Sequence, residues 1–307
     1  YFALAPLPLP QAPYDFTVKP GASLKSVSRQ LAADGLLMEP YTFWIMGRLL
    51  GKAGAIQAGT YRVQSAITPM ELLDKLARGD VFFVEVALIE GTTFRQWLEQ
   101  LRADARVKPT LGGKAPAEIA AIFGIEQPSP EGWFFPDTYR FSPGTPDIDI
   151  LKRAHAAMAK RLADAWAARD PSLPLRTPYE ALILASIVEK ETAVADERPL
   201  VASVFVNRLK GGMRLQTDPT VIYGMGETYE GTIRKKDLNA DTPWNTYTRD
   251  GLPPTPIAMP GAAAIAAAVK PADTDFLYFV AKGDGTHQFS RSLEEHNRAV
   301  AKYQLHK

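Results

Sequence analysis

One apolar run, T-P-Y-E-A-L-I-L-A-S-I-V-E-K-E-T at residues 177–192, constrains the fold more than any other segment of this chain. Thr177 is placed to accept the first free amide of a helix, and Pro178 suits the first helical position. Glu180 completes the T-x-x-E pattern of a capping box. The run therefore predicts one capped helix with a buried apolar body, around which its domain is organised.

Two glutamates with a lysine between them close this predicted helix. Glu191 follows Leu184 and Val188 at i+7 and i+3, so it continues the buried stripe, whereas Glu189 lies roughly 160° away around the helix. A glutamate at the end of a buried face loses solvation, which raises its pKa and keeps a proton available near neutral pH. The alternative is an ion pair between Glu191 and a basic residue such as Arg198 or Arg208.

Length and composition set the class of protein. The 307 residues are enough for about two domains. Hydrophobic residues make up 46% and charged residues 22%, which is typical of a globular protein. The 35 basic and 34 acidic residues leave a net charge of +1, so the chain lacks the basic surface of a nucleic-acid-binding protein. An uncharged polymer or a small polar substrate suits this balance better.

The residue types that bind metals are sparse. The absence of cysteine excludes disulfides, thiol catalysis and metal sites with cysteine ligands. The four histidines show no metal-binding spacing. We therefore predict neither a metal nor a cofactor.

The first thirteen residues carry four prolines and predict an extended tether rather than a helix. The chain begins with Tyr1 instead of methionine, so we expect that a signal or an anchor was removed upstream of residues 1–13. No apolar run in the sequence approaches the ~20 residues of a membrane span.

Residues 14–103 repeat one plan, in which a short strand, a turn with glycine and a Ser or Thr cap precede an amphipathic helix. Strands are predicted at 16–18, 59–63 and 84–88, and capped helices follow Ser23, Thr68 and Thr93. This pattern predicts an α+β region with paired strands and helices on one face. It favours a binding or positioning module, with a plain scaffold as the alternative.

Aromatic residues and long loops surround the predicted helix. Trp133, Phe134, Phe135 and Tyr139 could line a sugar-binding groove, or they could be the packed core of a loop. After the helix, Asp218-Pro219 predicts a loop between short extended pieces. The segment 242–260 is a long ordered loop, and loops of this length are usually functional.

Several blocks in one order resemble the YceG-like (MltG) family of endolytic murein transglycosylases. The resemblance covers nearly the whole chain after the proline-rich start. The matching blocks are E-G-W-F-F-P-D-T at 131–138, A-S-I-V-E-K-E-T at 185–192, V-A-S-V-F-V-N-R-L at 201–209, M-R-L-Q-T-D-P-T-V-I-Y-G at 213–224, N-T-Y at 245–247, G-L-P-P at 251–254, P-G at 260–261, Y-F-V at 278–280, and His287 with Phe289.

The resemblance implies an α+β fold, in which a small LysM-like peptidoglycan-binding module at 14–80 precedes a mixed α/β catalytic domain at 81–307 with a central catalytic helix. It implies one N-terminal helix anchored in the bacterial inner membrane, with the body in the periplasm. The expected partners are the glycan strands of nascent peptidoglycan, together with penicillin-binding proteins and other wall-synthesis enzymes. The family's catalytic glutamate falls on Glu191.

The expected chemistry is cleavage of the bond between N-acetylmuramic acid and N-acetylglucosamine, with Glu191 as general acid and then general base and a 1,6-anhydro end as product. The rival readings are a hydrolytic, lysozyme-type enzyme that uses Glu191 with Asp218, and a non-catalytic wall-binding scaffold. Candidate substrate-binding residues are Gln216, Asp218, Asn245, Tyr247, Ser186 and Trp133.

Each candidate has a structural alternative. Asp218 could lock its own turn, and Gln216, Asn245 and Tyr247 could hold their own loops. Ser186 could be a small packing residue, and Glu189 is expected to be a solvated or ion-paired neighbour.

Overall fold

The computed structural model describes residues 2–305, and its chain divides into two compact units. The N-terminal unit runs to Val86 and takes in two later segments, Arg106–Lys108 and Tyr139–Thr145. The C-terminal unit holds Ala87–Ala105, Pro109–Thr138 and the chain from Pro146 onward. The division between Val86 and Ala87 falls within the strand β3 (Val84–Leu88), six residues after the end of the module expected at 14–80.

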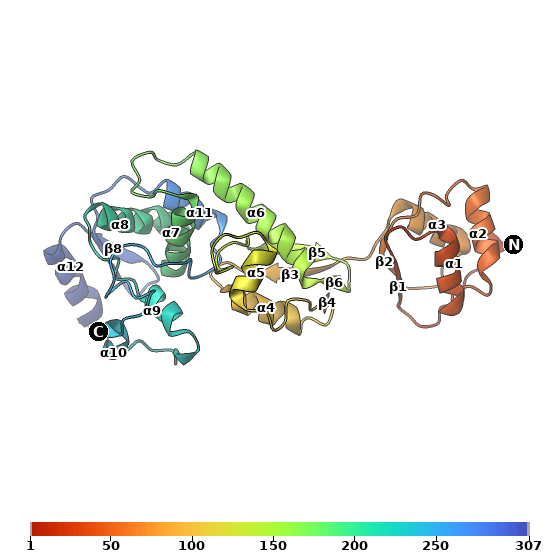
Figure 1. Cartoon of the computed structure of the whole chain (residues 1–307), viewed down its shortest axis with the longest axis horizontal. Helices are drawn as coiled ribbons and strands as arrows, with labels where there is room; N and C mark the ends of the chain where they lie inside the picture. Colours follow the sequence, from red (N-terminus) through yellow and green to blue (C-terminus); the bar gives the residue numbers. More distant parts are fainter. Residues whose placement is uncertain (1, 306–307) are drawn as a thin grey trace. The chain divides into compact units, whose positions relative to one another are not determined.

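The N-terminal unit is a two-stranded sheet with helices (Figure 1). The strands are antiparallel and pair from Tyr14↔Val63 to Val18↔Gly59. Alternate residues of the first strand are buried, as the sequence pattern requires. The elements are η1 (Phe2–Leu4), β1 (Tyr14–Val18), α1 (Leu24–Ala33), α2 (Pro40–Leu49), β2 (Gly59–Val63) and α3 (Pro69–Arg78).

The predicted caps form in this region. Ser23 accepts the Ser26 amide at the start of α1, and Thr68 and Glu71 close a full capping box on α3. A second box, between Thr93 and Gln96, opens α4 (Phe94–Ala103). The strand predicted at 84–88 is β3 (Val84–Leu88) and pairs with β5 (Asp137–Phe141), while β4 (Val107–Lys108) pairs with β6 (Thr145–Pro146).

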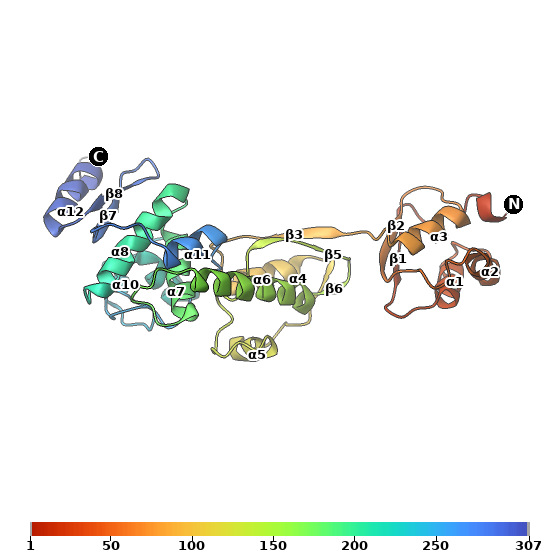
Figure 2. The ribbon, with the colours of Figure 1, turned by 90° about the horizontal axis from the view of Figure 1, so that it is seen from above.

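The C-terminal unit is built around α7 (Pro178–Glu191), which is the predicted central helix. Every residue from Ala181 to Val188 is buried. Helices α6, α8, α9 and α11 all pack against α7 (Figures 1 and 2). The remaining helices and strands are α5 (Pro116–Ile122), α6 (Asp147–Ala167), η2 (Ala195–Glu197), α8 (Arg198–Lys210), α9 (Asp218–Met225), η3 (Gly226–Thr228), α10 (Lys235–Asn239), α11 (Ala262–Val269), β7 (Tyr278–Ala281), β8 (His287–Ser290), α12 (Leu293–Val300) and η4 (Ala301–Leu305).

Three local predictions need correction. The capping box of α7 is half formed, because Thr177 accepts the Glu180 amide but the Glu180 carboxylate accepts the Arg176 amide instead. Asp218-Pro219 starts helix α9 rather than a loop, because proline and an acidic residue both suit the first turn. The helix α7 is buried on all sides and therefore has no single buried stripe.

For Phe134 and Phe135, the structure contains the packed core and not the sugar-binding groove. Phe134 is fully buried and Phe135 is 6% exposed, so these rings pack into the core of the C-terminal unit. Gly132 explains the tight turn before them: its φ is +81°, and a Cβ there would lie 2.5 Å from Pro256. Within residues 2–305, no helix is long and apolar enough to cross a membrane.

Candidate active site

A cavity of about 460 Å³ opens beside the C-terminal end of α7. Its walls come from α7, α8, the start of α9 and the segment before it, the loop after α10, the β7–β8 hairpin, α12 and η4. Polar and aromatic side chains dominate its lining. They include Glu191, Arg208, Gln216, Asp218, Tyr247, Tyr278, His287 and His296.

Glu191 is the last residue of α7 and is partly buried at the cavity wall. Its pKa is raised from 4.5 to about 7, mainly by burial and to a lesser extent by the nearby Asp218 carboxylate. A hydrogen bond from the Thr217 hydroxyl to Glu191 Oε1 opposes this shift, as do the charges of His287 and Arg208. Glu191 therefore holds a proton near neutral pH in a position open to a ligand.

The two arginines proposed as ion-pair partners of Glu191 are engaged elsewhere. Arg198 lies 3.4 Å from Glu189 Oε1, and Glu189 also accepts the Gly261 amide at 2.8 Å. Arg208 donates to the carbonyl oxygens of Leu277 and Leu215 at 2.7 and 2.8 Å. The ion-pair alternative for Glu191 is therefore wrong among the described residues, and Glu189 is the paired glutamate.

Asp218 and Tyr247 form a hydrogen-bonded pair on the same cavity. The Tyr247 hydroxyl donates to Asp218 Oδ1 at 2.5 Å. Burial and the Asp218 carboxylate both raise the pKa of Tyr247, so the phenol stays protonated and can keep donating. Asp218 adds negative charge near Glu191, but its carboxylate is held by the tyrosine.

Gln216 also lines the cavity, in a backbone conformation that is rare for its type. Its φ is +51°, and among the described residues it alone has a positive φ without being a glycine. Such a conformation costs about 1–3 kcal/mol and persists only where surrounding contacts fix it. The Gln216 amide donates to Thr246 O at 3.1 Å, and Arg208 Nη1 donates to Gln216 Oε1 at 3.4 Å. These contacts hold the Gln216 side chain at the wall of the cavity.

Three candidate residues from the sequence do not line this cavity. Ser186 is fully buried, donates to Ile183 O at 2.7 Å and accepts the Ile257 amide at 3.0 Å. Asn245 is also fully buried: its side chain accepts the Tyr247 backbone amide and donates to the carbonyl oxygens of Leu238 in α10 and Ala240 just after it. Trp133 stacks on Tyr179 with ring centroids 5.6 Å apart and packs against the core around α7.

His287 and Glu197 form a polar pair that sequence reasoning did not assign to the site. Glu197 Oε2 lies 2.7 Å from His287 Nδ1, and Glu197 Oε1 accepts the His287 amide at 2.7 Å. Thr192, directly after Glu191, donates to the same carboxylate at 3.2 Å. This arrangement fixes the orientation of the ring in the cavity. The only signal in the sequence was the presence of His287 in a matching block.

With this geometry in place, comparison with known proteins identifies the family. The model of the YceG-like family matches residues 16–302. This chain belongs to the YceG-like family. The resemblance predicted from the sequence blocks is confirmed.

Relatives of the YceG-like chain carry one name. This chain is 28% identical to the endolytic murein transglycosylase of Bacillus subtilis strain 168, over 94% of this chain and 84% of that protein. It is 27% identical to the endolytic murein transglycosylase of Streptococcus pneumoniae D39, over 92% of this chain and 57% of that protein. The prediction of an enzyme of the lytic transglycosylase class agrees with these names.

A solved structure supports the fold. The crystal structure of a yceG-like protein from Listeria monocytogenes superposes with a TM-score of 0.58 at 27% identity, covering 93% of this chain and 98% of that one. The α+β class of the YceG-like chain is therefore confirmed.

A second buried carboxyl group lies outside the Glu191 cavity. Glu131 is 4% exposed and lines a separate cavity of about 630 Å³. It accepts the Phe94 amide at 3.0 Å and the Tyr223 hydroxyl at 3.1 Å. Burial raises its pKa to about 7 despite these hydrogen bonds. Glu131 thus links the start of α4 to α9 and does not share a cavity with Glu191.

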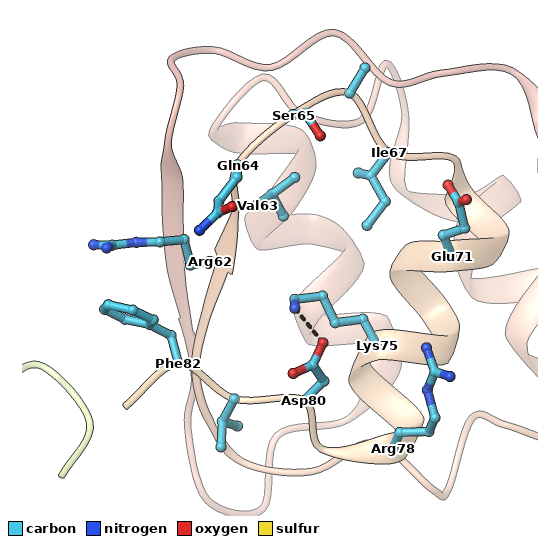
Figure 3. Close-up of a pocket in the computed structure, with 12 residues that line it drawn as sticks. Arg62, Val63, Gln64, Ser65, Ile67, Glu71, Lys75, Arg78, Asp80 and Phe82 are labelled. Carbon is cyan, nitrogen blue, oxygen red and sulfur yellow. Dashed lines mark hydrogen bonds and ion pairs between the residues drawn. The ribbon is translucent and has the colours of Figure 1, made fainter. Parts of the chain in front are cut away.

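The N-terminal unit has a cavity of its own, about 520 Å³ in volume, between β2 and α3 (Figure 3). The Lys75 ammonium group and Asp80 form an ion pair of 2.6 Å across it, and Arg62 lies over the ring of Phe82 at 3.7 Å. Among the described residues of the chain, no cluster of three His, Cys, Asp or Glu side chains could hold a metal ion.

Proposed function

We propose that this chain is an endolytic lytic transglycosylase that cleaves the glycan strands of peptidoglycan with Glu191 as its single acid–base group. The observation that carries the proposal is the state of Glu191. It has a pKa of about 7, no arginine partner and a place on a polar cavity, in a chain whose relatives are named endolytic murein transglycosylases. A protonated carboxyl group near neutral pH is what a general acid requires.

The proposed reaction needs no water. Glu191 gives its proton to the glycosidic oxygen as the bond from C1 of N-acetylmuramic acid breaks, which releases the hydroxyl group of N-acetylglucosamine. The resulting carboxylate then takes the proton from the C6 hydroxyl of the muramic acid, whose oxygen attacks C1 and closes a 1,6-anhydro ring. Because the nucleophile belongs to the substrate, one carboxyl group is sufficient, unlike the two of most glycoside hydrolases.

The other side chains of the cavity would bind and orient the sugar. Gln216 and the fixed imidazole of His287 can exchange hydrogen bonds with N-acetyl and hydroxyl groups. The Asp218–Tyr247 pair presents a further polar surface. Tyr278 lies on the cavity with the Arg208 guanidinium 5.1 Å from its ring and the His296 ring stacked at 5.2 Å, so its hydroxyl group is the part that a sugar can use. We propose a role in supporting the fold for Ser186, Asn245 and Trp133, because their contacts lie inside the folded chain.

The test is product analysis with two variants. Glu191→Gln should lower the release of muropeptides from peptidoglycan by at least ~10²-fold. Asp218→Asn should keep measurable activity and the same anhydro product, because Asp218 tunes the pKa of Glu191 and adds polar surface for the sugar but transfers no proton in this reaction. Mass spectrometry of the digest decides the reaction type: muramic acid reducing ends in place of anhydro ends would establish the hydrolytic reading. An active Glu191→Gln enzyme would eliminate Glu191 as the catalyst.

For the N-terminal unit, we propose a role in holding peptidoglycan. The β1-α1-α2-β2 order with one antiparallel strand pair supports a small LysM-like module, and the cavity in Figure 3 offers hydrogen-bonding side chains to a glycan. The inner-membrane anchor, the periplasmic location and the contacts with penicillin-binding proteins stay predictions from the family resemblance.

A further inference from the structure

The helix α2 is apolar on both of its sides. Its sequence, P-Y-T-F-W-I-M-G-R-L, has one charged residue, Arg48. Its inner side packs into the N-terminal unit through Phe43, which is fully buried, and Gly47, where an added Cβ would lie 2.1 Å from a methyl group of Leu24. A helix with one buried side normally carries polar residues on the other. Here the outer side needs a different explanation.

The outer side of α2 is a continuous apolar row. Tyr41, Ile45 and Leu49 follow one another at i, i+4 and i+8 and are 52%, 48% and 82% exposed. Met38, just before the helix, is 95% exposed and Leu50, just after it, is 43% exposed. Single exposed hydrophobic residues need no explanation, but these five lie within thirteen consecutive positions and form a patch.

The position of α2 leaves this row free within its own unit. Both views place α2 on the side of α1 that faces away from β1 and β2 (Figures 1 and 2). The row lies on a helix surface and contributes to none of the cavities described above. A row of side chains on a convex helix surface can lie against a flat apolar surface. It offers no pocket for a partner's side chain and no groove for a partner's helix.

The charges beside the row decide what kind of surface fits. Lys25 Nζ and the Arg48 guanidinium lie 5.2 and 5.5 Å from the centre of the Trp44 ring. Neither cation has a carboxylate partner in the described part of the chain. The nearby acid, Glu39, is occupied in accepting the amides of Tyr41 and Thr42 at the start of α2. Of these three charged groups next to the row, two are cations, so their sum is positive.

We propose that the outer side of α2 docks the N-terminal unit on an anionic lipid surface. Ile45 and Leu49 would enter the boundary between headgroups and acyl chains. Tyrosine and tryptophan, here Tyr41 and Trp44, are also favoured at this depth. Lys25 and Arg48 would meet the lipid phosphates, each contributing about tenfold or less to binding. This docking is a property of the N-terminal unit alone and does not depend on the reaction at Glu191.

The experiment uses the full chain and vesicles in a flotation assay. We expect the chain to float with vesicles of phosphatidylglycerol and phosphatidylethanolamine, and less with pure phosphatidylcholine. The variant Ile45→Ser/Leu49→Ser should lower the partition coefficient of the chain between vesicles and water by at least tenfold. Its matched control is Ile89→Ser/Leu293→Ser, which changes two residues that are 57% and 56% exposed in other parts of the fold and should float like the original chain.

A charge variant separates the two contributions. Lys25→Glu/Arg48→Glu should weaken binding to phosphatidylglycerol vesicles at least tenfold and leave the weak binding to phosphatidylcholine unchanged. Circular dichroism confirms that each variant is folded. Failure of the original chain to float with anionic vesicles overturns the proposal, and so does equal flotation of the Ile45→Ser/Leu49→Ser variant. Dimerisation that this variant abolishes, without vesicle binding, would make the row an interface between two copies of the chain.

Discussion

The chemistry proposed for Glu191 depends on opposing influences on one carboxyl group. Burial and Asp218 raise its pKa, while the Thr217 hydrogen bond and the charges of His287 and Arg208 lower it. The balance near 7 lets the same group give a proton and then take one within a single turnover. Apart from burial, each influence comes from a named side chain and can be removed separately.

The first prediction concerns the pH dependence of cleavage. Because Glu191 starts the reaction protonated, kcat/KM should fall as the pH rises through about 7. Thr217→Val removes a hydrogen bond that favours the carboxylate, so the pKa should rise and the falling limb should move up by roughly one pH unit. Rates measured between pH 5 and 9 on a soluble glycan test this.

The control for this shift lies on α9. The Thr220 hydroxyl is also buried, but it bonds to Thr217 O and the Thr246 hydroxyl and not to Glu191. Thr220→Val should leave the falling limb of the kcat/KM profile at the same pH as in the original chain. A Thr217→Val profile that superposes on the original one would contradict the assigned role of the hydroxyl group.

Among the helices, α4 and α9 are joined by the buried carboxyl group of Glu131. The contact explains why the E-G-W-F-F-P-D-T block starts with a glutamate: one oxygen meets the first amide of α4 and the other meets the Tyr223 hydroxyl. The pKa of this carboxyl group is raised to about 7 in the folded chain, above its ordinary value of 4.5. The stability that it provides is complete below pH 4.5 and is lost as the pH rises through 7.

The second prediction follows from this linkage. Glu131→Gln keeps an acceptor for the Phe94 amide and removes the ionisable group. Between pH 4.5 and 8, the free energy of unfolding of the original chain should fall relative to the variant by up to about 3 kcal/mol. Urea denaturation at both pH values measures the free energy of unfolding. Glu126→Gln, at an exposed position, is the control. A difference that does not change with pH would mean that the pKa of Glu131 is the same in the folded and the unfolded chain.

For the chain as a whole, the boundary between the units has consequences for truncation. The strand β3 pairs with β5, and both belong to the region where the units divide. A fragment 81–307 keeps β3, whereas a fragment 89–307 removes it and leaves β5 without its partner. Unpaired strand edges lose hydrogen bonds and invite aggregation.

The third prediction compares these two fragments. The fragment 89–307 should melt several degrees lower than the fragment 81–307. The fragment 81–307 should cleave soluble glycan but bind insoluble peptidoglycan at least about tenfold more weakly than the full chain, because it lacks the N-terminal unit that we propose to hold peptidoglycan. Scanning calorimetry and a pelleting assay measure these quantities. Equal pelleting would remove the binding role of the N-terminal unit.

Much of the local structure was available from the sequence. The alternation of Tyr14, Phe16 and Val18, the caps at Ser23 and Thr68, and the apolar run of α7 are local signals, and the structure contains the elements that they predict. The ordered blocks around E-K-E-T were enough to indicate the family. These features depend on neighbours within a few positions, which a sequence displays directly.

The tertiary structure alone decided which polar side chains meet at the site. Periodicity favoured Glu191 because of a buried stripe, yet α7 is buried on all sides, and the two glutamates are distinguished only by Arg198 and the cavity. Asn245 and Ser186 looked equally available in sequence, but each is fully engaged inside the fold. A side chain that is buried and hydrogen-bonded inside the fold cannot reach a ligand, and which side chains are buried depends on how distant segments of the chain pack together.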